Sequence, residues 1–334
     1  MKTCLPILLF CLPACSLFGV LTEAEQNQVA EHRLRCGRYF DAGKFEKAID
    51  QAQRGLAISP KDYSLRSRLG WSYLELASRT KDDNVENLRR ARVIFSEIMT
   101  WRDTDDHDSR TIFGFAKTLH NQARIEHLRA KMLQEDSQAP GNNKDPLLAQ
   151  AKQYTERGQE YERQSAQHFL TLAEGSVASN ANRREAYEYL MVLMYRLKDL
   201  NRAILYGNKY LELTKQQIAH WTEKYQTTRL PEFELLARNQ LDRLGKTATA
   251  VHASLAKYCR ENAQVDQAII HLDAVIAARP QSYQDYYLRA TCHRHKGNRA
   301  KAREDFQVFL QISNLPKQDK LFQDAYQYVY GKGK

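Results

Sequence analysis

The chain has 334 residues, of which 43% are hydrophobic and 27% are charged, with a formal net charge of +10. Beyond the N-terminus no apolar run is long enough to span a bilayer, which excludes a protein with several membrane spans and indicates a soluble helical body. The basic balance favours acidic partners, and nucleic acid is a poor candidate if the chain is exported.

The N-terminus has the features of a secretory signal. Lys2 precedes an apolar run, residues 5–12, and then Leu12-Pro13-Ala14-Cys15. This sequence resembles the lipobox of bacterial lipoproteins, although Pro13 is unusual at its position. The resemblance implies a signal peptide over residues 1–14, a palmitate-type lipid anchor on Cys15 and an anchored linker over residues 15–28.

Two alternatives to the lipoprotein signal remain open. The 18 apolar or small residues from Cys4 to Leu21 are barely enough for an uncleaved signal anchor. A soluble secreted form is the other alternative. In the lipoprotein family, Ser16 after the lipidated Cys permits export to the outer membrane. Removing residues 1–14 takes away one Lys and no acidic residue, so the formal charge falls from +10 to +9.

A repeated register follows in the body of the chain. Ala268, Leu272 and Ile276 are matched 34 residues later by Ala302, Phe306 and Leu310. This period is typical of stacked helix-turn-helix units, each of which buries its apolar face against its neighbours. The same offsets indicate further units, marked by Ala48 with Pro60, by Leu69-Gly70-x-x-Tyr73 with Ala91-x-x-x-Phe95, and by Ala203 with Leu211.

These residues resemble the tetratricopeptide repeat (TPR) family, whose Leu-Gly-x-x-Tyr, Ala-x-x-x-Phe and terminal Pro pattern is met piecewise in about five units. The resemblance implies an all-α fold, a right-handed superhelical solenoid over residues 29–316. The Trp usual near the start of the first helix is missing, and other residues occupy its place: His32, Arg66, Tyr187, His252 and Tyr286.

Two stretches do not fit the period, and a C-terminal segment follows the last repeat. Residues 110–136 and 146–177 read as two long helices and predict a divergent helical hairpin over about residues 110–177. Residues 216–245 suggest helices of nonstandard length around Pro231. Residues 317–334 read as a capping helix with a short tail, because apolar residues recur there at helical spacing.

Cysteines and histidines give no strong site. Without the signal peptide and Cys15, three cysteines remain, Cys36, Cys259 and Cys292, and because three is an odd number no complete disulfide framework exists. We expect Cys36 and Cys259 to pack as small hydrophobes. A Cys259–Cys292 bridge is conceivable on adjacent helices, but helix stacking usually holds such backbones too far apart.

No catalytic or metal motif is present in the sequence. In Cys292-His293-Arg294-His295 only Cys292 and His295 share a helix face, so a packed or solvated histidine is the favoured reading of His293. No nucleophile elbow, phosphate-binding loop or zinc-protease motif occurs. The sequence therefore predicts no enzyme, no cofactor, no metal and no small-molecule substrate.

The remaining candidate is a groove. In TPR proteins the second, fifth, ninth and twelfth positions of the first helix point into the groove, and here these offsets, with one adjacent residue, select cations and aromatics: Arg33, Arg68, Trp71, Lys257, Arg260, Tyr287 and Arg294. Such a set suits an acidic or C-terminal peptide. The alternative is that they are ordinary exposed side chains. The Asn that the family's carboxylate clamp needs at the ninth position is replaced: Gly37, Trp71, Val192, Lys257 and Thr291.

The sequence thus predicts an envelope lipoprotein that acts as a protein-interaction scaffold or adaptor, lipid-anchored at the periplasmic face of the outer membrane. It resembles the TPR lipoproteins that help assemble secretin channels, pili, outer-membrane proteins or proteolytic complexes. Two alternatives stay open: a regulatory arm of a cell-wall or proteolytic enzyme complex, and a helical-repeat RNA-binding protein.

Overall fold

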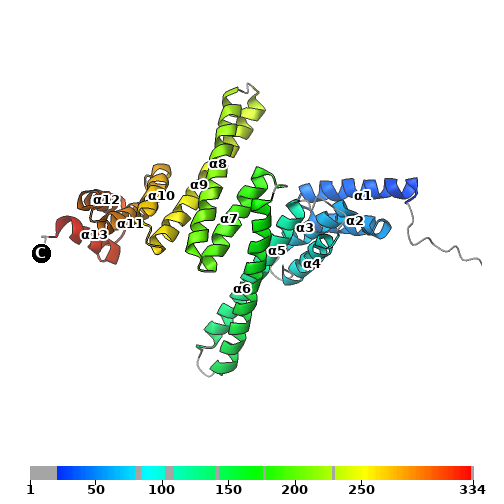
Figure 1. The fold of residues 1–334 in the computed structure, drawn as a ribbon, viewed down its shortest axis with the longest axis horizontal. Helices are drawn as coiled ribbons and strands as arrows, with labels where there is room; N and C mark the ends of the chain where they lie inside the picture. The colour runs from blue at the N-terminus through cyan, green and yellow to red at the C-terminus, as the bar shows by residue number, and fades with distance from the viewer. Residues whose placement is uncertain are drawn as a thin grey trace, which may run out of the picture. The chain divides into compact units, whose positions relative to one another are not determined.

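The computed structural model describes residues 21–79, 84–101, 109–139, 143–175, 178–227 and 230–331. These residues form thirteen α-helices (Figure 1). The chain divides into two compact units, residues 1–100 and residues 101–334. The extent of one solenoid over residues 29–316 stays a prediction from the sequence.

Unit 1 consists of two helical hairpins. Its helices are α1 (Glu23–Asp41), α2 (Phe45–Ile58), α3 (Tyr63–Arg79) and α4 (Asn84–Met99). The α1 helix begins with a capping box, in which the Thr22 hydroxyl and the Glu25 carboxylate each accept a hydrogen bond from the other's backbone N–H. The predicted linker over residues 15–28 is therefore helical from Glu23.

Small residues hold the hairpins of unit 1 together. Ala48 and Ala91 are fully buried, as the repeat register requires. Gly70 lies so close to the Phe95 ring that an added Cβ would stand 2.9 Å from it. Because the α1–α2 turn needs a left-handed backbone, Gly43 occupies it with φ +69°.

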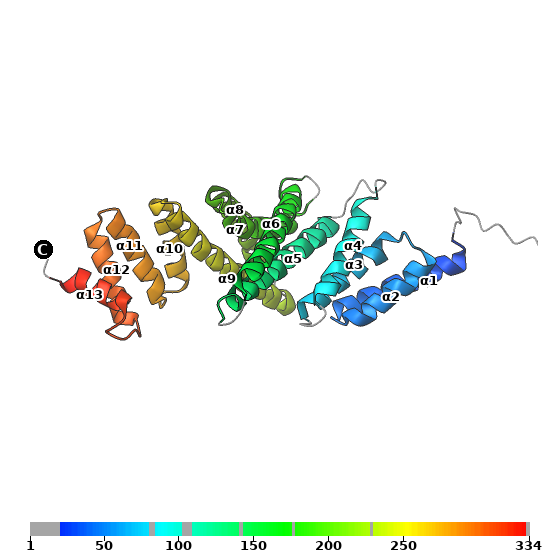
Figure 2. The same cartoon turned by 90° about the horizontal axis from the view of Figure 1, so that it is seen from below.

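Unit 2 contains four helix pairs and a final helix. Its helices are α5 (Ser109–Asp136), α6 (Lys144–Glu174), α7 (Asn180–Arg196), α8 (Leu200–Thr227), α9 (Pro231–Glu261), α10 (Val265–Ala278), α11 (Tyr283–His295), α12 (Arg299–Ile312) and α13 (Lys320–Tyr330). Within this unit α5 with α6, and α8 with α9, form long hairpins that extend to opposite sides in Figure 1. Figure 2 shows α11, α12 and α13 following one another as neighbours.

The long hairpins match the predicted departures from the period. Small buried residues allow the two helices of the α5–α6 hairpin to pack closely, among them Ala123, Ala151 and Gly158. The α9 helix starts at Pro231, where a missing N–H costs nothing, and then runs unbroken to Glu261. In the regular repeats Ala203, Ala268 and Ala302 are all fully buried, which confirms the register read from the sequence.

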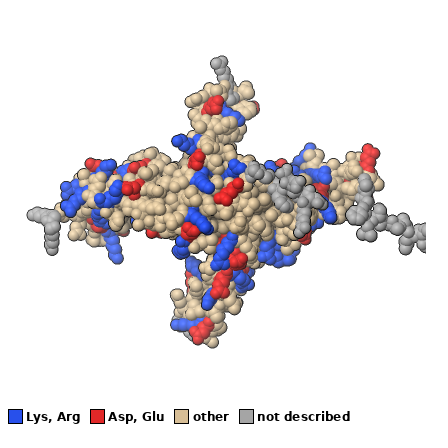
Figure 3. Space-filling view, viewed as in Figure 1, with Lys and Arg blue, Asp and Glu red and all other residues tan. Residues whose placement is uncertain are grey.

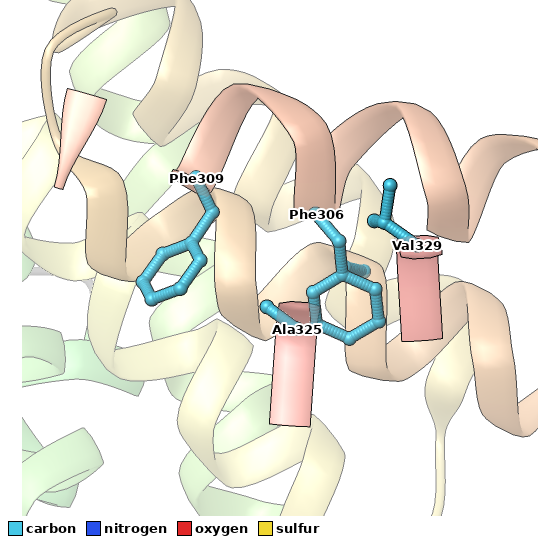
Figure 4. Close-up of a cluster of buried hydrophobic side chains, with 5 residues drawn as sticks. Phe306, Phe309, Ala325 and Val329 are labelled. Atoms are coloured by element: carbon cyan, nitrogen blue, oxygen red, sulfur yellow. The ribbon is translucent and has the colours of Figure 1, made fainter. Parts of the chain in front are cut away.

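The predicted capping helix is α13. Its Ala325 and Val329 pack against Phe306 and Phe309 of α12 and Ala290 of α11 (Figure 4). Both phenylalanine side chains are fully buried. Removing α13 from this place would return their rings to water.

Cys36 and Cys259 are fully buried, as expected for small hydrophobes, and burial raises the pKa of each thiol to about 11. Cys292 is also buried, and all three are free thiols, so Cys259 and Cys292 do not form a bridge. Among the described helices, none combines the length and the apolar character needed to cross a membrane.

Candidate functional site

Helices α5, α7, α8 and α9 of unit 2 line a cavity of about 400 Å³, which we call the α7–α9 cavity. Helical periodicity places Glu185, Glu188 and Val192 on one face of α7, and this face forms one wall. Arg243 and Thr247 of α9 line it as well. The other lining residues come from α5, α7, α8 and α9: His120, Arg184, Tyr189, Tyr210, Gln217, Gln240 and Leu244.

His120 brings a buried polar group to this cavity. The side chain is only 7% exposed, and its Nδ1 has no hydrogen-bond partner in the protein. Burial lowers the pKa of His120 to about 4, with smaller effects from Arg196 and Arg124. The ring is therefore neutral at physiological pH and can offer one donor and one acceptor, while its edge packs on Tyr189 at 5.2 Å between ring centroids.

Arg184 and Glu188 supply charges of both signs. Arg184 donates to the amide oxygen of Gln217 and lies 5.9 Å from the ring centroid of Tyr210, while its Nε has no partner. Glu188 opens onto the cavity, but surrounding protein removes much of its water; this desolvation and then the Glu185 carboxylate raise the pKa of Glu188. Donors and acceptors thus face one space, as the amide groups of a peptide require.

Two of the predicted groove residues, Tyr287 and Arg294, meet on an acidic side chain of the chain itself. The Tyr287 hydroxyl donates to Asp324 of α13 at 2.8 Å, and Arg294 donates to both oxygens of Asp324 at 3.0 and 3.1 Å. Burial first and then Asp324 raise the pKa of Tyr287 to about 12. The acidic ligand expected at these residues is, in this structure, the capping helix.

Lys257 turns toward α7 instead. Its ammonium group lies 4.8 Å from the ring centroid of Tyr195 and 4.0 Å from the Glu261 carboxylate, and the Tyr195 hydroxyl donates to Glu261 at 3.1 Å. The Tyr195 ring in turn stacks on Tyr258 at 4.2 Å between centroids. Burial raises the pKa of the Cys292 thiol, and Arg260, one turn further along α9 than Lys257, opposes this with a smaller lowering effect.

The three predicted groove residues of unit 1 take part in packing. Arg33 donates through Nε to Asp62 at 2.7 Å, and that carboxylate is 1% exposed. Arg68 donates to the Arg33 carbonyl oxygen at 3.1 Å, which ties α3 to α1. Trp71 packs edge-on against Phe95 at 6.0 Å between ring centroids. These contacts hold neighbouring helices together within the unit.

The α7–α9 cavity was missed from the sequence, although a signal for part of it existed. The offsets used for the other repeats select Glu185, Glu188, Val192 and Tyr195 when they are applied to α7. A search for cations and aromatics passes over the two carboxylates. His120 lies on the inserted hairpin outside the period, so no repeat offset reaches it.

Charges of both signs are spread over the surface of the molecule. Lys and Arg intermingle with Asp and Glu over the face drawn in Figure 3. Within the described parts of the chain, no group of three or more His, Cys, Asp or Glu side chains is arranged to hold a metal ion. His293 is packed at 8% exposure beside Asp305.

The chain consists of helix pairs with a small buried residue at each repeat position. It also has left-handed turns between paired helices and a capping helix at the end of the described residues. The chain has a TPR-type helical-repeat fold. No family model matches it, and no curated protein matches it in sequence.

Several solved structures are similar to the chain in fold. A structure from the functional characterisation of Pseudomonas aeruginosa PilF is 13% identical, covers 90% of this chain and 98% of that chain, and has a TM-score of 0.45. A TPR protein from Parabacteroides merdae is 12% identical, covers 91% and 99%, and has a TM-score of 0.35. The Nro1 nuclear import adaptor is 11% identical, covers 91% and 86%, and has a TM-score of 0.43.

Proposed function

We propose that this TPR-type protein is a protein-interaction scaffold whose α7–α9 cavity receives a segment of a partner protein. The observation that carries the proposal is a cavity of about 400 Å³ lined by His120 and Arg184, each of which has a buried nitrogen atom without a hydrogen-bond partner, and by Glu185 and Glu188. Buried polar groups normally have hydrogen-bond partners, and an extended peptide supplies donors and acceptors in alternation.

The mixed charge of this cavity sharpens the expected ligand. Glu188 and Arg243 line the same space, so a segment with both a basic and an acidic or amide side chain fits better than a uniformly acidic one. The acidic-ligand role expected for Tyr287 and Arg294 requires that Asp324 leave them first, since both residues hold it.

Photo-crosslinking tests the proposal. A benzophenone amino acid at Val192, a half-buried lining position, should trap a discrete partner protein in cells. The same probe at Lys131, whose side chain is 69% exposed on the α5–α6 hairpin, is the control. No adduct at Val192, or the same adducts at both positions, would remove the α7–α9 cavity as the docking site.

We further propose that the protein works in a bacterial envelope, as a lipoprotein anchored through Cys15 that helps assemble a membrane, secretion or pilus-type complex. The support is the Leu12-Pro13-Ala14-Cys15 sequence after a short apolar run. Cys15 and the signal peptide lie outside the described residues. A helical body that docks proteins, tethered by lipid chains at about 0.8 kcal/mol for each buried methylene, would hold its partners at the membrane.

A further inference from the structure

A second cavity lies against the opposite face of α7, and it belongs to none of the sites above. It has a volume of about 520 Å³ and is lined by α6, the end of α7 and the start of α8; we call it the α6–α8 cavity. Leu190 and Met194 line it, and these residues point away from Glu188 and Val192 of the α7–α9 cavity, because they lie about half a helical turn apart on α7.

The floor of the α6–α8 cavity is apolar. Ala166, Leu190, Met194 and Tyr206 are buried there. Leu170 adds a half-buried aliphatic side chain. A floor of this kind removes an apolar side chain from water and contributes about 25 cal/mol for each Å² that is covered.

The rim of the cavity is cationic. It carries four basic side chains: Arg163, Arg196, Lys198 and Arg202. The one acidic lining residue, Asp199, is already used, because its carboxylate accepts the backbone N–H of Arg202 at 3.0 Å at the start of α8. The rim therefore has more positive charge than its own lining residues neutralise.

The rim arginines differ in how easily a ligand can replace their partners. Arg163 contacts Glu160 at 2.9 Å with side chains 58% and 53% exposed, and such surface pairs are weak. Arg196 contacts the buried Glu162 at 3.3 Å, but Glu162 also has His127 at 3.3 Å. A carboxylate arriving at the rim can exchange with the exposed Arg163 contact at little cost, whereas the buried Glu162 carboxylate holds Arg196 in place.

Lys198 stands in a strained backbone position at this rim. Its φ is 66°, in the left-handed region, where the corresponding turns of two other repeats have Gly43 and Gly297. The turn between α9 and α10 carries Ala263 at φ 56°, with no side chain beyond Cβ. Lys198 and Ala263 therefore share the same backbone strain, but only Lys198 places a cation at the cavity.

We propose that the α6–α8 cavity binds an acidic peptide segment that carries an apolar side chain. The apolar side chain fills the floor and the carboxylates meet the rim. Gln159 and Gln167 on the rim each offer an amide acceptor as well as donors, which suits peptide N–H groups. A lipid phosphodiester is less well matched, because it presents no donor for those acceptors. This site goes beyond the proposed function, since it is a second docking point on the other side of α7.

Fluorescence anisotropy with a defined probe tests the site. The probe is a fluorescein-labelled peptide with the sequence Glu-Leu-Glu-Glu-Leu-Glu, titrated with the full chain. The comparison ligands are the same peptide with Gln in place of Glu and vesicles of phosphatidylglycerol. Binding of the acidic peptide should be tighter than that of the Gln peptide and should weaken with added salt.

Two sets of variants locate the binding. Combining Arg163→Gln with Arg202→Gln should weaken peptide binding roughly three- to tenfold, while Arg54→Gln, at a similarly exposed helical ion pair in unit 1, should leave it unchanged. Lys198→Gly should weaken binding and leave the melting temperature equal or higher. Ala263→Gly relieves the same strain and should leave binding unchanged.

Several outcomes would overturn the proposal. These are equal binding of the Gln peptide, unchanged binding in the double arginine variant, an equal loss with Ala263→Gly, or preferential binding of the vesicles that the double variant abolishes. The last outcome would assign the cavity to lipid. Crosslinking at Val192 does not depend on this cavity, so failure here and failure of the proposed function are distinguishable.

Discussion

At the residue scale, one polar contact recurs between the two helices of a repeat. Nδ1 of His32 lies 3.0 Å from the amide oxygen of Gln51 in unit 1, and Nδ1 of His252 lies 3.0 Å from Nδ1 of His271 in unit 2. Both pairs are 19 residues apart in sequence. The second pair has two titratable rings, and it accepts a proton poorly because two like charges would then stand side by side.

The His252–His271 pair should therefore make stability depend on pH. Burial, and then His252, lower the pKa of His271 to about 4, whereas the pKa of a histidine in the unfolded chain is about 6.5. Between these values the unfolded chain binds more protons, so the free energy of unfolding falls as pH drops from about 6.5 toward 4. The variant His271→Gln recreates the His–Gln pair of the first repeat. Its effect on the free energy of unfolding should be more favourable at pH 4.5 than at pH 7.5 by about 1–2 kcal/mol.

Urea denaturation at both pH values measures this difference. His120, whose pKa is also lowered to about 4, remains in the variant and keeps part of the pH dependence. If His271→Gln loses as much stability as the unchanged chain between pH 7.5 and 4.5, the histidine pair is not the source.

At the element scale, close approach of helices depends on residues without large side chains. Ala302 is fully buried between α12 and its neighbours, and an added Cβ at Gly207 of α8 would stand 2.5 Å from the side chain of Leu255. Packed interiors have no spare volume for extra methyl groups. The small residues therefore set how closely the helices of unit 2 approach one another.

Ala302→Leu should overpack α12 and lower the free energy of unfolding by about 1–3 kcal/mol. Repeat arrays are coupled mainly to nearest neighbours, so the loosening should concentrate in α11, α12 and α13. Hydrogen exchange followed by mass spectrometry reads this out helix by helix. Protection that stays unchanged in these helices would argue against the importance of the contact.

The α13 helix should be loosened separately by Asp324→Ala. This change removes the acceptor of Tyr287 and Arg294, at a cost of about 1 kcal/mol because the carboxylate is 38% exposed. Exchange should accelerate in α13 while α7 keeps its protection. Glu304→Ala, at an exposed position of α12, is the control. Equal exchange in both variants would show that the Asp324 contacts do not hold the cap.

The elements were largely predictable, because a register of small and large apolar residues determines which faces pack. The positions of Ala48, Ala91, Ala268 and Ala302 followed from spacing alone, and all are fully buried. Side-chain partners did not follow: the offsets placed Arg294 in a groove, but only the path of α13 brings Asp324 to it. The α7–α9 cavity likewise depends on His120, which lies outside the repeat pattern.

At the scale of the whole molecule, two cavities on opposite faces of α7 allow one unit to hold two segments at once. When a partner carries two segments, binding of the first segment raises the effective concentration of the second segment at the other cavity. A membrane anchor would add a further constraint by keeping both near the bilayer. Whether such an anchor exists depends on the N-terminus.

Cys15→Ala tests the anchor directly. In the lipoprotein family the cysteine sulfur carries the diacylglycerol, so this variant should lose all incorporation of labelled palmitate and accumulate as an unprocessed precursor. Cys11→Ala is the matched control, because Cys11 lies in the same apolar segment and this variant should be labelled and processed normally.

Fractionation of membranes separates the alternatives. Palmitate labelling that persists in Cys15→Ala would reject the lipid anchor, and an unlabelled, uncleaved chain that stays in the membrane in both variants would identify residues 4–21 as a signal anchor. A chain that is cleaved, unlabelled and released in both would be a soluble secreted protein, and its docking cavities would then act away from the membrane.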